Sequence, residues 1–321
     1  MSNHVSMASA SSTSAGTRIA SRESGVAPAN SRSATATFPP PAGLRDVSFR
    51  PRGASTVDVD FPPSRTKNPD METGYRDLAA HYSLLFPLND RQRGFFEHLI
   101  GSGPVESVLD VGCGTGEHLA WFSARGLRAY GLEPDETMFR ELKRRRWPGS
   151  VPTLAQAGVE ALPGLLGARV DLVLCLGNTL AHLQEREDAQ LAVRRMADAL
   201  SPRGRLVIQT VNFDRVLEEG SASFPVIERA LPDGGRVVFY REYDLGALPA
   251  RILFKTRLVT PEGERRAAWP LVPLRRDELL RYFEEAGLGE IRDFGDYDRL
   301  PFARNSPALI LLAQRGQPAE L

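Results

Sequence analysis

A glycine-rich loop and the acidic residues around it carry the strongest chemical signal in this sequence. The loop 112–116 follows the short apolar run 107–111 and precedes a helical pattern. Glycines let a loop turn tightly and approach a ligand closely, and a helix amino terminus favours an anion. Glu133 follows the next expected strand, where an acid can accept both hydroxyls of a ribose. A plain turn would explain the glycines alone, but the whole series predicts a nucleoside-containing ligand.

The spacing of the glycines distinguishes between classes of nucleoside. A dinucleotide site favours Gly-x-Gly-x-x-Gly, whereas Gly112, Gly114 and Gly116 are spaced Gly-x-Gly-x-Gly. Asp110 precedes the first of them by two residues, where it suits a ligand with an ammonium group and repels a pyrophosphate. An NAD-dependent dehydrogenase is therefore the weaker alternative.

Two segments carry a family resemblance. Residues 109–116 resemble the first motif of the class I S-adenosylmethionine-dependent methyltransferases, and residues 131–135 resemble the second. The resemblance spans roughly 75–315 and implies an enzyme with S-adenosylmethionine as its cofactor. The cofactor contacts that it implies come from Asp110, Gly112, Gly114, Gly116, Glu133 and Pro134.

A further segment resembles one group within that family. Residues 175–183 read Cys-Leu-Gly-Asn-Thr-Leu-Ala-His-Leu, where the glycine and glycine/sarcosine N-methyltransferases carry Cys-Leu-Gly-Asn-Ser-Phe-Ala-His-Leu. The resemblance implies that the Leu176 carbonyl accepts the methionine ammonium and that Thr179 contacts the methionine carboxylate. It also implies that Asn178 faces the substrate.

Two departures from that group concern the acceptor and the adenine. Its members place an arginine before Asn-Tyr-Asp to grip the glycine carboxylate, but Val211 precedes the corresponding segment 212–214 here. An amino-acid acceptor would therefore lack a charge-assisted anchor. Gly158 stands where many relatives have an acid for the adenine amino group, so we expect backbone groups near Val159, or Glu160, to contact adenine.

Tyrosine, asparagine and histidine side chains supply the remaining candidates. We expect Tyr82 to cover the cofactor as a lid, the alternative being an aromatic that only docks its helix. Asn178, Asn212 and Tyr297 are expected to position the acceptor through hydrogen bonds. His182 is either a general base or a hydrogen-bonded structural residue.

The acceptor is expected to be a small molecule, and the glycine-type motif favours an amine. Methyl transfer from a sulfonium is an in-line displacement that needs proximity and alignment more than acid–base help. An O-methyltransferase and a non-catalytic S-adenosylmethionine-binding protein remain alternatives. The sequence leaves the oligomeric state open.

The composition argues against a nucleic-acid-binding protein, a disulfide-rich or zinc protein, and a membrane-spanning protein. The 321 residues include 40 basic and 40 acidic side chains, and zero net charge argues against a nucleic-acid partner. Two cysteines cannot build a disulfide framework or a cysteine-rich zinc site, so no metal is expected. No apolar run reaches the roughly 18 residues that span a bilayer. We therefore expect a cytoplasmic enzyme without nucleic-acid or membrane partners.

Strands that alternate with helices from residue 75 onward predict the fold class. We expect an α/β fold with a doubly wound, mostly parallel seven-stranded sheet of the Rossmann-like methyltransferase type. The expected strands are 107–111, 128–132, 151–154, 171–176 and 205–211, followed by a hairpin of 290–297 and 308–314. The expected helices are 75–86, 91–100, 117–125, 135–146, 187–200 and 275–286.

The alternation breaks between residues 212 and 272. Antiparallel strands are expected at 236–243 and 252–259, with a turn signal at 261–263. Long insertions at the ligand-binding edge of such sheets commonly cover a ligand, so we interpret 212–272 as a substrate-side β insertion or lid.

Residues 1–70 differ in composition from the rest. Residues 1–40 contain ten Ser and four Thr but a single acid, and they lack apolar periodicity. We expect a disordered segment. We prefer the interpretation that these residues are a mis-annotated or dispensable extension, because most basic residues are arginines, as in GC-rich coding DNA, and Met71 directly precedes the first helical pattern. The methyltransferase domain is then 71–321.

Overall fold

The computed structural model describes residues 75–162, 164–220, 222–248 and 250–316. The expectations for residues 1–70 lie outside these ranges. Within the expected helix 75–86, the 3-10 helix η1 (Ala79–His81) is followed by the short α2 (Tyr82–Leu85). The helix ends before Pro87, whose ring restricts the preceding residue.

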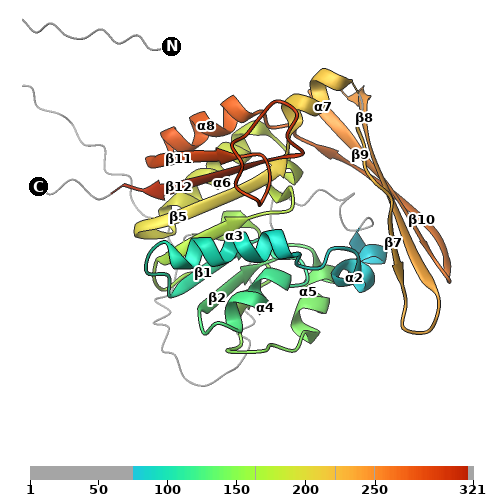
Figure 1. The fold of residues 1–321 in the computed structure, drawn as a ribbon, viewed down its shortest axis with the longest axis horizontal. Coiled ribbons are helices and arrows are strands. Elements are labelled where there is room, and N and C mark those ends of the chain that lie inside the picture. Colours follow the sequence, from blue (N-terminus) through green and yellow to red (C-terminus); the bar gives the residue numbers. More distant parts are fainter. Residues whose placement is uncertain (1–74, 163, 221, 249, 317–321) are drawn as a thin grey trace, which may run out of the picture. The chain divides into compact units, whose positions relative to one another are not determined.

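A seven-stranded sheet forms the centre of the fold, in the order β11-β12-β5-β4-β1-β2-β3 (Figure 1). Its strands are β1 (Ser107–Val111), β2 (Arg128–Leu132), β3 (Thr153–Ala155), β4 (Val170–Cys175), β5 (Leu200–Val211), β11 (Leu288–Phe294) and β12 (Ala308–Arg315). Strands β1 to β5 pair in parallel, and β12 runs antiparallel to both of its neighbours. The expected fold class is confirmed. Because the strand order reverses between β1 and β4, ligands are expected at their carboxyl ends.

Helices cover both faces of this sheet (Figure 1). One layer contains α3 (Asp90–Gly101), α4 (Glu117–Ser123) and α5 (Glu136–Arg144), and the other contains α6 (Arg186–Asp198) and α8 (Arg276–Glu285). Alternate residues of β1 serve the two layers: Val108 packs with the first, and Leu109 packs with the second. Within the described residues, no helix combines the length and apolar character that crossing a bilayer requires.

The insertion after β5 forms a second sheet. It contains β6 (Ala222–Ser223), β7 (Ile227–Ala230), β8 (Arg236–Leu248), β9 (Arg251–Thr260) and β10 (Gly263–Leu271), and α7 (Phe213–Glu219) precedes it. Strand β8 pairs antiparallel with β6, β7 and β9, and β9 pairs antiparallel with β10. The expected antiparallel pair is therefore present as β8 and β9, and the turn signal at 261–263 separates β9 from β10.

Strand β5 differs from its sequence-based prediction because it begins at Leu200 rather than at 205. Residues 201–204, between the expected helix 187–200 and the expected strand 205–211, contain a proline and a glycine, which favour a loop. The structure extends the strand through them by means of an irregularity, in which Arg203 has φ of 63° and the register with β4 shifts between Val170 and Leu172.

We predict that Phe122→Ala lowers the free energy of unfolding by about 3–5 kcal/mol, measured by urea denaturation, because a buried cavity forms. Phe122 is fully buried, with ring centroids 5.1 Å from Phe96 and 4.9 Å from Trp121. The control is Leu191→Ala, since Leu191 is 45% exposed and its loss should cost about 0.5 kcal/mol or less. Equal losses in the two variants would contradict the packing of this layer.

Candidate active site

The glycine loop is held at the end of β2 by backbone hydrogen bonds. Positive φ angles of 72°, 56° and 84° occur at Gly112, Gly114 and Gly116. The backbone N–H groups of Gly112 and Cys113 donate to the Leu132 carbonyl at 2.8 and 3.0 Å. A Cβ atom at Gly112 would lie 2.3 Å from Cγ2 of Thr179. Only glycine therefore permits both the turn and the close approach of the segment after β4.

The Glu133 side chain also holds the glycine loop by hydrogen bonds. Its Oε2 accepts the Gly114 N–H at 2.8 Å, and its Oε1 accepts the Asp135 N–H at 2.9 Å. Burial raises the pKa of Glu133 to about 7, and the charges of Asp135 and Asp110 act in the same direction. The two N–H donors oppose that rise without cancelling it. Glu133 as a whole residue is 6% exposed, and it lines a cavity.

Two adjoining cavities lie at the carboxyl ends of β1, β2 and β4. The first, which we call the loop cavity, has a volume of about 130 Å³ and is lined by Glu133, Pro134, Asp135, Met138, Val159 and Leu180, among others. The second, the insertion chamber, has a volume of about 310 Å³ and is lined by Asn178, Gln209, Arg241, Tyr243, Trp269 and Tyr297, among others. The two cavities share the side chains of Tyr75, Tyr82, Thr179 and His182.

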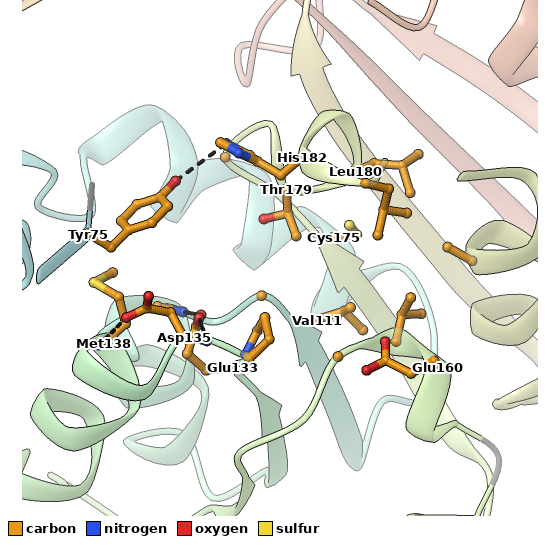
Figure 2. Close-up of a pocket in the computed structure, with 18 of the residues that line it drawn as sticks. Tyr75, Val111, Glu133, Asp135, Met138, Glu160, Cys175, Thr179, Leu180 and His182 are labelled. Atoms are coloured by element: carbon orange, nitrogen blue, oxygen red, sulfur yellow. Dashed lines mark hydrogen bonds between the residues drawn. The ribbon is translucent and has the colours of Figure 1, made fainter. Parts of the chain in front are cut away.

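A group of rings forms the wall between the two cavities. The Tyr75 hydroxyl lies 3.4 Å from Nε2 of His182, and the Tyr75 ring lies 5.4 Å from that of Trp269. Figure 2 shows Tyr75 and His182 on the opposite side of the cavity from Glu133. Burial lowers the pKa of His182 to about 4, so its imidazole is neutral at pH 7. Burial raises the pKa of Tyr82 to about 12.

The insertion chamber brings together hydrogen-bonding groups from both sheets. Asn178 adopts φ of 69°, accepts the Val211 N–H at 3.2 Å and lies within 3.4 Å of the Tyr243 hydroxyl through its Nδ2. The Tyr297 hydroxyl donates to Gln209 at 3.4 Å. Buried nitrogens without a hydrogen-bond partner among the described residues include those of His182 (Nδ1), Arg241 (Nε) and Trp269 (Nε1).

The structure gathers most of the predicted site residues around these two cavities. Those that line the loop cavity are Tyr82, Gly112, Gly114, Glu133, Pro134, Val159 and Thr179. Those that line the insertion chamber include Leu176, Asn178 and Tyr297. Asp110, Gly116 and Asn212 line neither. Asp110 is 1% exposed and lies 3.2 Å from Nδ1 of His118, while Gly116 begins α4.

Asn212 is not brought to the acceptor side because its amide is bonded to backbone groups. Its Oδ1 accepts the Arg215 N–H at 3.2 Å and caps α7. Its Nδ2 donates to the carbonyls of Arg304 and Ser306, both at 3.0 Å. Asn212 therefore joins the start of the insertion to the segment before β12.

Sequence reasoning missed the chamber residues that the insertion supplies. Arg241, Tyr243 and Trp269 all line the chamber. Phe239, Arg241 and Tyr243 alternate along β8, so they share one face of the strand. That alternation lies within a strand that the sequence predicted, and it was the available signal.

The described part of the chain contains no group of three or more His, Cys, Asp or Glu side chains that could bind a metal ion. Cys113 and Cys175 are both free and buried. Burial raises the pKa of both thiols, which keeps them protonated and unreactive at neutral pH.

Comparison with known proteins identifies relatives of this arrangement. Residues 108–204 match a family model described as a methyltransferase domain. The glycine/sarcosine N-methyltransferase of Parasynechococcus marenigrum (strain WH8102) is 28% identical over 230 residues, 70% of this chain and 78% of that protein. The dTDP-4-amino-2,3,4,6-tetradeoxy-D-glucose N,N-dimethyltransferase of Saccharopolyspora spinosa is 30% identical over 187 residues, 57% of this chain and 72% of that protein.

The crystal structure of an S-adenosylmethionine-dependent methyltransferase from Clostridium acetobutylicum has the same fold, with a TM-score of 0.61. The two chains are 15% identical, and the comparison covers 75% of this chain and 99% of that one.

The raised pKa of Glu133 predicts a pH-dependent stability that Glu133→Gln removes. Between its ordinary value of 4.5 and about 7, the folded state holds a proton that the unfolded state has lost. The contribution of Glu133 to the free energy of unfolding therefore falls as the pH rises across this window, by about 3 kcal/mol. The measurement is urea denaturation of parent and variant from about pH 5 to about pH 8. A difference between them that does not change with pH would contradict the prediction.

Proposed function

The chain belongs to the class I S-adenosylmethionine-dependent methyltransferases, near the glycine N-methyltransferase group, and on that premise we propose that it methylates the amino group of a small molecule. The two named relatives reported above are N-methyltransferases. The observation that carries the proposal is the pair of adjoining cavities, because one accommodates part of a nucleoside cofactor beside the glycine loop while the other offers a separate chamber for an acceptor.

The residues around the loop cavity fit the cofactor. Each oxygen of the Glu133 carboxylate accepts one backbone N–H and keeps a lone pair for a ribose hydroxyl. Gly112 and Gly114 let side chains that line the cavity approach the loop closely, since a Cβ atom would lie 2.3 Å from Thr179 at the first position and 3.3 Å from Met138 at the second. We propose that Pro134 and Val159 contact the nucleoside and that Tyr82 covers the sulfonium end, while Asp110 and Gly116 shape the loop from beneath.

Leu176 and Thr179 are assigned to the methionine end of the cofactor. The Thr179 hydroxyl donates to the Leu176 carbonyl at 2.7 Å, so its proton is already committed. Both oxygens keep lone pairs, which suit an ammonium group. We therefore propose that Thr179 contacts the ammonium beside the Leu176 carbonyl rather than the carboxylate that the family resemblance implies.

The chain's own groups promote transfer by positioning the acceptor. The cofactor supplies an electrophilic methyl group when it is bound. The protein has to hold a neutral amine in line with that group, and orientation of this kind is worth roughly 7–11 kcal/mol. Asn178 and Tyr243 meet in the insertion chamber, and Tyr297 lines the same space. We propose that these three side chains orient the amine by hydrogen bonds, and that Asn212 acts only by holding α7.

His182 is assigned a positioning role rather than that of a general base. A base is effective when its pKa lies near the working pH, whereas burial lowers the pKa of His182 to about 4. Its Nε2 lies by the Tyr75 hydroxyl, and its Nδ1 is buried without a partner in the described part of the chain. The imidazole can therefore orient Tyr75 and present one nitrogen to a bound ligand.

We also propose that the enzyme works in the cytoplasm. Its two cysteines are free and buried, which is usual for proteins of a reducing compartment.

We predict that the purified protein transfers a labelled methyl group from S-adenosylmethionine to amines in a metabolite extract, with mass spectrometry identifying an N-methyl product. The control is Glu133→Ala, which removes the expected ribose acceptor and should weaken S-adenosylhomocysteine binding by about tenfold or more. Products labelled only on oxygen would contradict the amine assignment. Cofactor binding without any labelled product would favour a non-catalytic binding protein.

Val211→Arg tests the link to glycine-type acceptors. Val211 lines the insertion chamber at the position where the glycine-type enzymes carry their arginine. Restoring that charge should raise methyl transfer to glycine or sarcosine by about tenfold or more, because a charge-assisted bond forms with the carboxylate. Val211→Met is the uncharged control of similar length. Equal activity of the two variants toward glycine would show that this position does not govern acceptor choice.

A further inference from the structure

The insertion sheet presents a charged residue on an otherwise apolar and aromatic face. Arg241 lies between Phe239 and Tyr243 on the face of β8 that lines the insertion chamber. It is the one arginine or lysine among the described residues that line this chamber. Thr256 lies opposite Arg241 on β9. Because β8 pairs with β9 on one side and with β6 and β7 on the other, the charge does not serve to protect a strand edge.

Among the described residues, no carboxylate forms an ion pair with Arg241. Its side chain donates a hydrogen bond to the Pro225 carbonyl at 3.3 Å. Its guanidinium carbon lies 5.1, 5.7 and 5.9 Å from the ring centroids of Phe224, Phe86 and Phe239. Its Nε is buried without a hydrogen-bond partner within the described chain.

Burial lowers the pKa of Arg241, and no carboxylate in the described part of the chain acts to raise it. Arg241 is partly buried, with its Nε enclosed. A cation removed in part from water without an anionic partner carries a desolvation cost that nearby charge does not offset. The rings contribute a weaker attraction through their π faces. An anion in the insertion chamber would supply the opposite charge that the described residues do not place beside Arg241.

We propose that Arg241 is the anion anchor of the acceptor site, binding a carboxylate or phosphate carried by the amine that is methylated. This inference rests on the proposed function and names the class of its acceptor. Val211 leaves the usual position of an anchoring arginine uncharged, and Arg241 brings a guanidinium into the same chamber from the insertion. A guanidinium binds two oxygens of one carboxylate or phosphate side by side, which fixes the orientation of the acceptor.

The experiment measures anion binding to the protein saturated with S-adenosylhomocysteine, by calorimetry with three probes. Benzoate and benzamide have nearly the same shape and differ in charge, and phenyl phosphate distinguishes phosphate from carboxylate. We expect benzoate or phenyl phosphate to bind about tenfold or more tightly than benzamide. Equal or undetectable binding of all three probes would overturn the proposal.

The matched variants are Arg241→Met and Arg257→Met. Arg257 lies on β9 opposite Tyr240, with its guanidinium carbon 3.7 Å from the centroid of the Tyr240 ring, and it pairs with Glu264. Neither Arg257 nor Tyr240 lines the chamber. Arg241→Met should abolish the preference for the anion and leave S-adenosylhomocysteine affinity unchanged, whereas Arg257→Met should behave as the parent. Unchanged anion preference in Arg241→Met would refute the anchor.

Two further measurements distinguish loss of the anion anchor from misfolding of the variant and from failure of the proposed function. If Arg241→Met does not fold, Arg241→Lys should retain the preference for the anion, and the comparison of benzoate with benzamide in the parent still decides. Arg241-dependent anion binding without methylation of any amine would contradict the proposed function alone. Methylation of amines with no effect of Arg241 on the choice between charged and neutral acceptors would contradict the anchor alone.

Discussion

The site depends on one buried carboxylate that joins two segments of backbone. Glu133 accepts the N–H of Gly114 from the glycine loop and the N–H of Asp135 at the start of α5. The conformation of the glycine loop therefore depends on where β2 ends, and the register of β2 with β1 sets that position. A carboxylate enclosed in this way is costly when charged, which explains the rise in its pKa to about 7. The residue that we assign to the ribose is thus also the residue that shapes the floor of the cavity.

The sequence predicted the sheet well where local signals and the tertiary structure agree. The limits predicted for 107–111 and 128–132 are those of β1 and β2, because the first run lies between Pro104 and Gly112 and the second follows Gly126 at the end of a helix. The start of β5 could not be predicted, since Pro202 and Gly204 are loop formers by local propensity, and pairing with β4 overrides that propensity. Strands β6, β7 and β10 were missed because the insertion lacks the regular spacing of βα units.

The floor of the site was predictable, and its opposite wall was not. Loop residues such as Gly112 and Gly114 perform their task through backbone conformation, which their residue type reveals. Asn212 shows the limit of a motif, because the residue type alone does not tell a ligand contact from a helix cap. Arg241 and Trp269 are separated by one strand in the sequence, and only the pairing of β8 with β9 and of β9 with β10 brings them to one face.

Asn178 connects these two parts of the molecule. Its side chain accepts the backbone N–H of Val211 and contacts the Tyr243 hydroxyl, and the neighbouring Ala181 carbonyl accepts the Val272 N–H at 2.8 Å. The family match covers residues 108–204 and stops before the insertion begins. Most of the residues that line the loop cavity lie within that matched segment, whereas Arg241, Tyr243 and Trp269 of the insertion line the chamber that we propose for the acceptor. A change in the insertion that keeps the contacts of Tyr243 with Asn178 and of Val272 with Ala181 would therefore reshape the chamber and leave the loop cavity as it is.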